Sequence, residues 1–273
     1  MIHQIDDATD PRLAQYRNVG DPAALDRRGL FVAEGRLVAE RLLEDGWFDL
    51  HSVAVTPAAL EPLRPLFRQQ PSIAVYVCEP SVLQAITGFN FHRGCVALAY
   101  RTPRTLTLDE AATATCVLAL EGVTNPDNVG GLFRTALAFG VDAVLLDDAS
   151  ADPLYRKAIR TSMAASLRLP FVRVDPWLDG LETLRAAGLR VVALTPHPDA
   201  TPLADYAAHA DERIAVLVGS EGFGLGRESL QRADVRVRIA IDPRADSLNV
   251  VTAAAIALHA LRNGDSPRFG GGR

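Results

Sequence analysis

From Cys116 onward the chain alternates short apolar runs with segments of helical periodicity, and this alternation constrains the fold more than any other feature. The runs CVLAL, AVLL, FVRV, VVALT, IAVLV and VRVRIAI are the expected strands. Helices are expected at Asn128, through Tyr155 and Ser162, around Leu181, near Leu203, from Arg227 and from Leu248. Because the strands are nearly all apolar and are separated by helices, the pattern predicts an α/β domain with a parallel sheet covered on both faces.

The chain of 273 residues, 48% of them apolar, is long enough for two domains. Residues 1–105 predict a small α/β domain with candidate strands SVAVT, IAVYVC and CVALAY and a helical stretch RLVAERLLEDG. The segment RTPRTLTLD, residues 101–109, lacks periodicity and is typical of a linker. Residues 106–262 form the second predicted domain, and residues 263–273, NGDSPRFGGGR, are expected to be a disordered tail.

Composition narrows the class of protein. No run reaches the roughly 18 apolar residues of a membrane span, and the first ten residues, MIHQIDDATD, are too polar for a signal peptide. We therefore expect a cytoplasmic protein without membrane contact. The three cysteines stand apart in apolar runs, which favours buried free thiols over disulfides or a metal site, and no metal is expected: Cys78, Cys95 and Cys116.

The net charge of −5 does not by itself indicate a nucleic-acid-binding protein. Nearly every positive charge is nevertheless an arginine, with Lys157 the only lysine. Arginine suits bidentate contacts to phosphate, although genomic base composition explains the bias equally well.

Three motifs carry the chemistry, in a fixed order. The first is NPDNVGGLFRTALAFG at residues 125–140, the second is VGSEGFGL at residues 218–225, and the third is DSLNV at residues 246–250. Asn128 and Arg134 follow a strand and are expected on nearby faces of one helix within its first two turns, near a helix N-terminus that favours anions. The second motif ends a strand in a turn of small residues, where backbone groups can approach a ligand closely.

In this order, the motifs resemble those of the SpoU, or TrmH-like, branch of the SPOUT RNA methyltransferases. The resemblance implies a parallel sheet whose C-terminal segment threads a deep trefoil knot, S-adenosylmethionine as cofactor, and methylation of a ribose 2′-hydroxyl of RNA. It also implies a homodimer formed through the C-terminal domain. FVAEGRLVAERLLEDG and GFNFHRGCVALA are similar to the small substrate-binding domain of members that act on ribosomal RNA.

The resemblance assigns roles to individual residues. Arg134 is expected to activate the ribose hydroxyl, and because guanidinium stays protonated we favour electrostatic stabilisation over proton abstraction. The other expected catalytic residues are Asn128, Glu221, Ser247 and Asn249. The expected cofactor-binding residues are Leu194, Gly219, Ser220, Glu221, Ile239 and Leu248. Departures from the family pattern occur at Arg93, Ala240 and Val251.

Other interpretations stay open. Asn128 and Ser247 are each plausible helix N-caps, Arg134 could be an ordinary surface charge, and Glu221 could stabilise a helix terminus. Ribosomal RNA is favoured over transfer RNA because the first hundred residues form a separate domain. An RNA-binding protein without catalysis is a second class, and a nucleotide-dependent oxidoreductase is a third. The turn EGVTNPDNVGG lacks the G-x-G-x-x-G that the third class requires.

Overall fold

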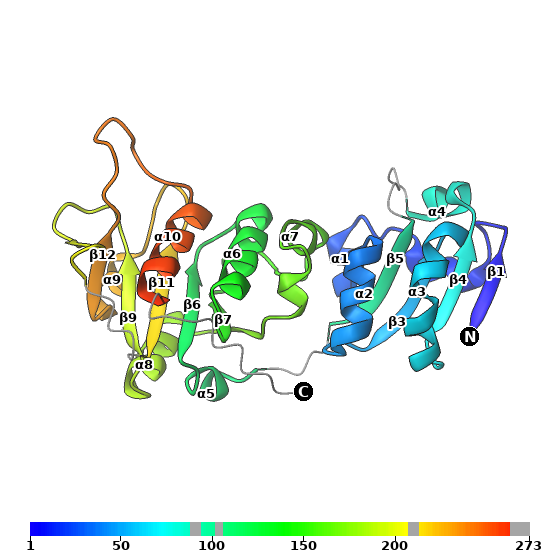
Figure 1. The fold of residues 1–273 in the computed structure, drawn as a ribbon, viewed down its shortest axis with the longest axis horizontal. Coiled ribbons are helices and arrows are strands. Elements are labelled where there is room, and N and C mark those ends of the chain that lie inside the picture. Colours follow the sequence, from blue (N-terminus) through cyan, green and yellow to red (C-terminus); the bar gives the residue numbers. More distant parts are fainter. Residues whose placement is uncertain (88–93, 102–105, 207–212, 263–273) are drawn as a thin grey trace. The chain divides into compact units, whose positions relative to one another are not determined.

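The computed structural model describes residues 1–87, 94–101, 106–206 and 213–262 (Figure 1). The chain divides into two compact units. Unit 1 combines Met1–Arg104 with Leu154–Arg168, and unit 2 combines Thr105–Pro153 with Leu169–Arg273. Leu154–Arg168 falls in the second predicted domain, but by its contacts this segment groups with the first unit. Arg93, residues 102–105 of the predicted linker and the predicted tail lie outside the described residues.

Unit 1 is built on a five-stranded mixed sheet in the order β1-β4-β3-β5-β2. Strand β1 and strand β3 run parallel to β4, whereas β2 and β3 run antiparallel to β5. Its elements are β1 (Ile2–Ile5), the 3-10 helix η1 (Pro11–Tyr16), α1 (Pro22–Asp26), β2 (Leu30–Glu34), α2 (Arg36–Asp45), β3 (Leu50–Val55), α3 (Pro57–Gln69), β4 (Ala74–Cys78), α4 (Pro80–Thr87), β5 (Cys95–Tyr100), α7 (Arg156–Thr161) and the 3-10 helix η2 (Ala165–Leu167).

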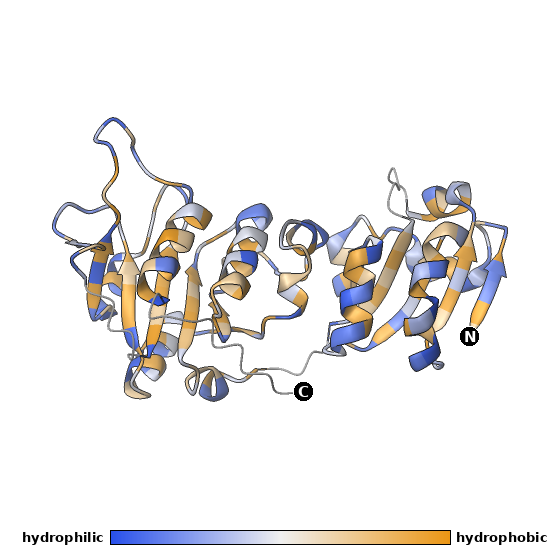
Figure 2. Ribbon diagram, in the orientation of Figure 1, coloured by the Kyte–Doolittle hydropathy of each residue, from blue (hydrophilic) through white to orange (hydrophobic). Residues whose placement is uncertain are grey.

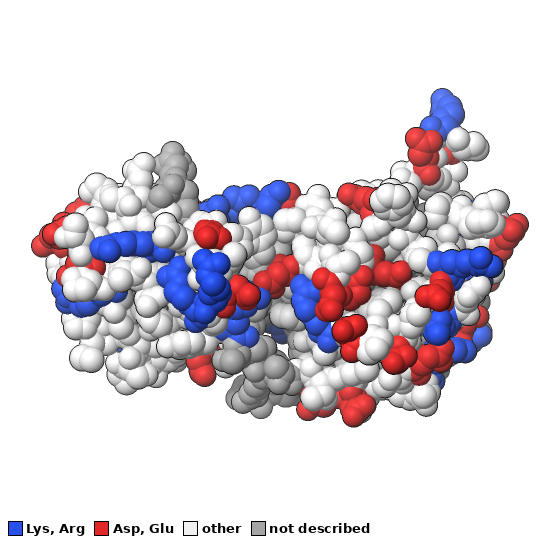
Figure 3. All heavy atoms as spheres, turned by 180° about the vertical axis from the view of Figure 1, so that it is seen from behind, with Lys and Arg blue, Asp and Glu red and all other residues white. Residues whose placement is uncertain are grey.

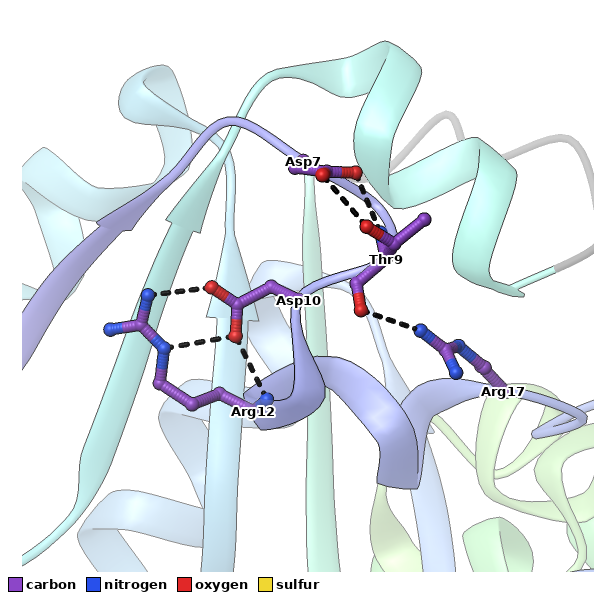
Figure 4. Close-up of polar contacts among 5 residues, drawn as sticks. All are labelled: Asp7, Thr9, Asp10, Arg12 and Arg17. Carbon is purple, nitrogen blue, oxygen red and sulfur yellow. Dashed lines mark hydrogen bonds and ion pairs between the residues drawn. The ribbon is translucent and has the colours of Figure 1, made fainter.

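The segment after β1 is shaped by side-chain hydrogen bonds (Figure 4). The Asp7 carboxylate accepts from the backbone N–H of Thr9 at 2.8 Å and from its hydroxyl at 2.7 Å. Asp10 caps η1 by accepting from the Arg12 backbone N–H, and it also pairs with the Arg12 guanidinium at 2.6 Å. These hydrogen bonds lower the pKa of Asp10 to about 2. The cap starts a helix that buries Leu13 and Tyr16 in the core of unit 1.

Unit 2 contains a seven-stranded sheet in the order β10-β12-β9-β11-β6-β7-β8, and every strand pair in it is parallel. Its elements are α5 (Leu108–Ala111), β6 (Cys116–Glu121), α6 (Pro126–Ala138), β7 (Ala143–Leu146), β8 (Phe171–Arg173), α8 (Trp177–Ala186), β9 (Arg190–Leu194), β10 (Thr201–Pro202), β11 (Ile214–Gly219), α9 (Arg227–Arg232), β12 (Val235–Arg238) and α10 (Val250–Arg262).

The central strands of unit 2 are buried on both faces. Val117 and Ala119 of β6 pack in one apolar cluster with Leu181 of α8. Leu118 and Leu120 alternate with them, so they face the other side of the sheet, and they are also fully buried. Figure 2 shows the resulting apolar strands. The predicted parallel sheet is confirmed.

Two expectations about local structure need correction. The helix expected near Leu203 is absent, because Thr201 and Pro202 pair with β12 and a turn follows at residue 203. Strand β1 was not predicted, since IHQI is short and half polar. None of the helices in the described ranges is long and apolar enough to cross a membrane.

Candidate active site

A cavity of about 680 Å³ opens in unit 2 where strands β9, β11 and β12 end. Ligands of open α/β sheets bind at the carboxyl ends of the strands, which is where this cavity lies. It is lined by every residue of the predicted cofactor set, namely Leu194, Gly219, Ser220, Glu221, Ile239 and Leu248. Thr195, Pro196 and Asp246 also line it and were not predicted from sequence. Thr195 and Pro196 follow Leu194 in the sequence and Asp246 precedes Ser247, so their neighbours could have indicated that they line the same site.

The loop that follows β11 forms one wall of the cavity through its backbone. The Gly224 N–H donates to the Ser220 carbonyl at 3.0 Å, and the two residues form an isolated antiparallel bridge. A Cβ on Gly219 would lie 2.3 Å from the Gly224 carbonyl carbon. Gly222 has φ +97°, in the region that favours glycine. The tight turn therefore needs glycine at these positions and leaves backbone groups open toward the cavity.

Residues from all three motifs meet in one polar cluster beside the cavity. The Asn249 side-chain amide donates to Glu221 Oε1 at 2.6 Å and to Asn128 Oδ1 at 3.2 Å. Asn128 is only 7% exposed, whereas Glu221 and Asn249 are exposed at the cavity. The cluster thus joins residues 121 positions apart in the chain.

The caps of the two helices differ from the sequence-based alternatives. Asn125, and not Asn128, caps α6 by accepting from the Asp127 N–H at 3.0 Å. The reason is Pro126, which fixes φ at the first helical position and leaves the preceding residue as the cap. At α10 the cap is Asn249, and not Ser247, because Asn249 Oδ1 accepts from the Val251 N–H at 2.9 Å.

The remaining predicted catalytic residues lie outside the cluster. Ser247 is exposed and lines the cavity. Arg134 is exposed on α6, and no hydrogen bond or ion pair connects it to the rest of the described chain. Six residues of α-helix separate it from Asn128, which turns the two side chains roughly 120° apart. The expectation that they lie on nearby faces is therefore wrong.

A second polar network holds the loop between β6 and α6. Asp147, directly after β7, accepts from the Gly122 N–H at 2.9 Å and from the Ser150 hydroxyl at 2.6 Å. The Ser150 hydroxyl oxygen in turn accepts from the Val123 N–H at 3.1 Å. This network fixes the chain between β6 and Asn125. Val251, one of the departures from the family pattern, packs against Gly131. A Cβ on Gly131 would lie 2.8 Å from the Val251 side chain, so the glycine leaves room for the valine.

The charge pattern of the protein is mixed. Figure 3 shows basic and acidic side chains interspersed over the part of this face formed by described residues. No group of three or more His, Cys, Asp or Glu residues that could hold a metal ion occurs in the described ranges.

The chain is similar to a known protein family, to several proteins and to solved structures. A model described as "SpoU rRNA Methylase family" matches residues 115–259. An uncharacterized tRNA/rRNA methyltransferase of Mycobacterium tuberculosis is 39% identical over 272 residues, covering 94% of this chain and 91% of the relative. The 23S rRNA (guanosine(2553)-2′-O)-methyltransferase of Bacillus subtilis is 27% identical, covering 96% of this chain and all of that protein (100%). The AdoMet-bound rRNA methyltransferase from Sinorhizobium meliloti has a TM-score of 0.80 at 25% identity, covering 96% of this chain and 97% of that one.

Proposed function

Because this chain belongs to the SpoU rRNA Methylase family, we propose that it transfers a methyl group from S-adenosylmethionine to a ribose 2′-hydroxyl of RNA. Ribosomal RNA is the proposed substrate. The observation that carries the proposal is the hydrogen-bonded cluster of Asn128, Glu221 and Asn249 beside the cavity of unit 2.

The cavity suits S-adenosylmethionine in size and chemistry. Its volume of about 680 Å³ is within the usual range for small-molecule sites. The apolar walls for the adenine ring are formed by Leu194, Ile239 and Leu248. At Gly219 a side chain would clash with the turn, so the residue is glycine and its backbone groups are available to the ligand. Carboxylates also line the cavity and favour a ligand that carries positive charge. When bound, S-adenosylmethionine supplies an electrophilic methyl group.

The residues around the cavity have different proposed roles in the reaction. We assign Arg134 to the ribose, where its permanent charge stabilises the negative charge that develops on the 2′-oxygen. Asn249 orients the Glu221 carboxylate through its 2.6 Å hydrogen bond, and the buried Asn128 fixes Asn249 in turn. Ser247, on the cavity wall, supplies a polar contact to substrate or cofactor. Positioning of the two reactants then provides much of the rate acceleration.

The proposal extends to the whole chain. Unit 1 is proposed to recognise the RNA, and the C-terminal segment of unit 2 to thread a trefoil knot. We propose a homodimer through unit 2, in which residues of the partner border each site. Leu137 of α6 and Ile256 of α10 support it, because these apolar side chains are 37% and 39% exposed on helices that pack together. Action on ribosomal RNA implies a cytoplasmic protein.

Transfer of labelled methyl from S-adenosylmethionine to purified ribosomal and transfer RNA tests the proposal. Wild type is expected to label ribosomal RNA, and Glu221→Gln to label it much more slowly while folding normally. Labelling of transfer RNA alone would reassign the substrate. Cofactor binding without transfer to either RNA would favour a binding protein over an enzyme.

A further inference from the structure

We propose that Glu121, the last residue of β6, is a positioning residue that fixes the loop carrying Glu221. This inference rests on the proposed function for its catalytic consequence, but the contacts that support it are independent of any ligand. All of them lie within unit 2.

Glu121 holds both ends of the loop that connects β11 to α9. Its backbone is the register partner of Gly219, the residue from which the loop departs. Its side chain then reaches the other end, where Oε1 accepts from the Gly226 N–H at 3.0 Å. The second oxygen, Oε2, accepts from the indole N–H of Trp177 at 3.2 Å. One residue therefore closes the loop, and the indole holds its carboxylate in place.

The surrounding sequence is adapted to this contact. A Cβ on Gly226 would lie 2.7 Å from Glu121 Oε1, so a side chain at this position would shift the carboxylate from its present place. Inside the loop, Ser220 and Gly224 are bridged, and Ser220, Glu221 and Gly222 line the cavity. Hydrogen bonds to an ionised acceptor are stronger than neutral ones. The Glu121 carboxylate thus restrains the segment from which Glu221 reaches Asn249.

The consequence for the reaction follows from distance. Glu221 meets Asn249 at 2.6 Å, and small displacements of reacting groups reduce rates steeply. Loss of the Glu121 side chain would free the Gly226 end of the loop. Weaker cofactor binding and a lower kcat are then expected together, because the same loop lines the cavity and carries Glu221.

The test compares Glu121→Ala with Glu121→Gln and Trp177→Phe. Glutamine can still accept from the Gly226 N–H through its carbonyl oxygen, but its NH2 group cannot accept from the Trp177 indole. Trp177→Phe removes the indole N–H and keeps a smaller aromatic ring. We expect Glu121→Ala to raise the Kd for S-adenosylmethionine and to lower kcat, each about tenfold or more. Trp177→Phe, which keeps the carboxylate and its contact with Gly226, should stay within about threefold of wild type, and Glu121→Gln should lie between it and Glu121→Ala. Gly226→Ala perturbs the same contact without changing Glu121, because its Cβ would lie 2.7 Å from Glu121 Oε1, and a smaller change in the same direction is expected; it replaces Glu121→Ala if that variant does not fold.

Hydrogen exchange of the free protein provides a readout that needs no activity. In Glu121→Ala, the amides of residues 220–226 should exchange at least tenfold faster, while those of β6 and β11 stay protected. Unchanged loop exchange, or unchanged Kd and kcat in a variant that has only become less stable, would overturn the inference. If loop exchange and Kd respond but wild type methylates no RNA, the positioning role stands and the proposed reaction fails.

Discussion

The polar cluster at the cavity leads to a prediction about Asn249 that can be worked out from its hydrogen bonds. Asn249→Ala removes the cap of α10 and the only donor that reaches Asn128 Oδ1 in the contacts described above. Loss of a cap costs about 0.5–2 kcal/mol, and an unsatisfied buried acceptor costs about 1–3 kcal/mol. Glu221 is exposed, so water replaces its lost partner at little cost. We expect unit 2 to lose about 1.5–5 kcal/mol of unfolding free energy.

Asn249→Asp keeps the cap of α10 but changes the contact with Glu221. The aspartate retains an acceptor for the Val251 N–H, but it replaces the amide that stands 2.6 Å from the Glu221 carboxylate with a second negative charge. Like charges at this distance raise the pKa of the pair in the folded state. The folded variant then binds protons more tightly than the unfolded chain, so its stability should rise as the pH falls from about 7 toward 4. Wild type lacks this pair and should not gain stability in this way.

Urea unfolding followed by tryptophan fluorescence measures both effects. The chain has two tryptophans, so a Trp47→Phe background leaves Trp177 as the sole reporter, and Trp177 lies in unit 2. Asn128→Ala and the double variant Asn128→Ala/Asn249→Ala complete a double-mutant cycle, for which we expect a coupling of about 0.5–1.5 kcal/mol. If Asn249→Asp were as stable as wild type at pH 7 and lacked the rise at lower pH, the cluster described here would be wrong.

Three further predictions concern the turn, the arginine and the thiols. Gly219→Ala forces a Cβ to within 2.3 Å of the Gly224 backbone, so titration calorimetry should show at least tenfold weaker S-adenosylmethionine binding, whereas Gly20→Ala, with open space around it, should bind normally. Arg134→Ala should lower kcat by about 100-fold or more with an unchanged melting temperature, because Arg134 is exposed; equal rates in the two enzymes would remove its assigned role. Burial raises the pKa of the thiols of Cys78, Cys95 and Cys116 to about 11 or 12. A disulfide reagent at pH 9 should therefore react with these thiols only after unfolding. The free energy of unfolding should fall as the pH rises from about 9, because the thiols of the unfolded chain ionise there while the buried ones stay protonated. Rapid reaction of the native protein would contradict this burial.

Much of unit 2 could be predicted from sequence because its strands are continuous apolar runs that alternate with helices. Such strands must be buried on both faces, and parallel strands joined by helices satisfy this requirement. The helix expected near Leu203 failed because that segment is short and its structure is set by pairing with β12, which no local pattern reveals. The same holds for β1, whose partner β4 lies about seventy residues along the chain.

The candidate site could be assembled in part. Motif order placed Gly219, Glu221 and Asn249 together, and they line one cavity. Asn128 and Ser247 were plausible caps from sequence, but Pro126 leaves Asn125 as the cap of α6, and Asn249 caps α10. The role of Glu121 lay beyond sequence reasoning, since its side chain contacts Gly226 and Trp177, which come from two other elements. Helical spacing by itself turns Arg134 about 120° from Asn128, and the structure adds that Arg134 is exposed.

Alkaline hydrolysis of the labelled RNA identifies the atom that receives the methyl group. Ribosomal RNA labelled with S-adenosylmethionine by the wild-type protein is hydrolysed in alkali, which cleaves RNA beside every free 2′-hydroxyl. The account predicts that the label survives in alkali-resistant dinucleotides, and that Arg134→Ala yields almost none. Label released entirely as methylated mononucleotides would mean that a base, and not a ribose, is the acceptor, and would contradict the account.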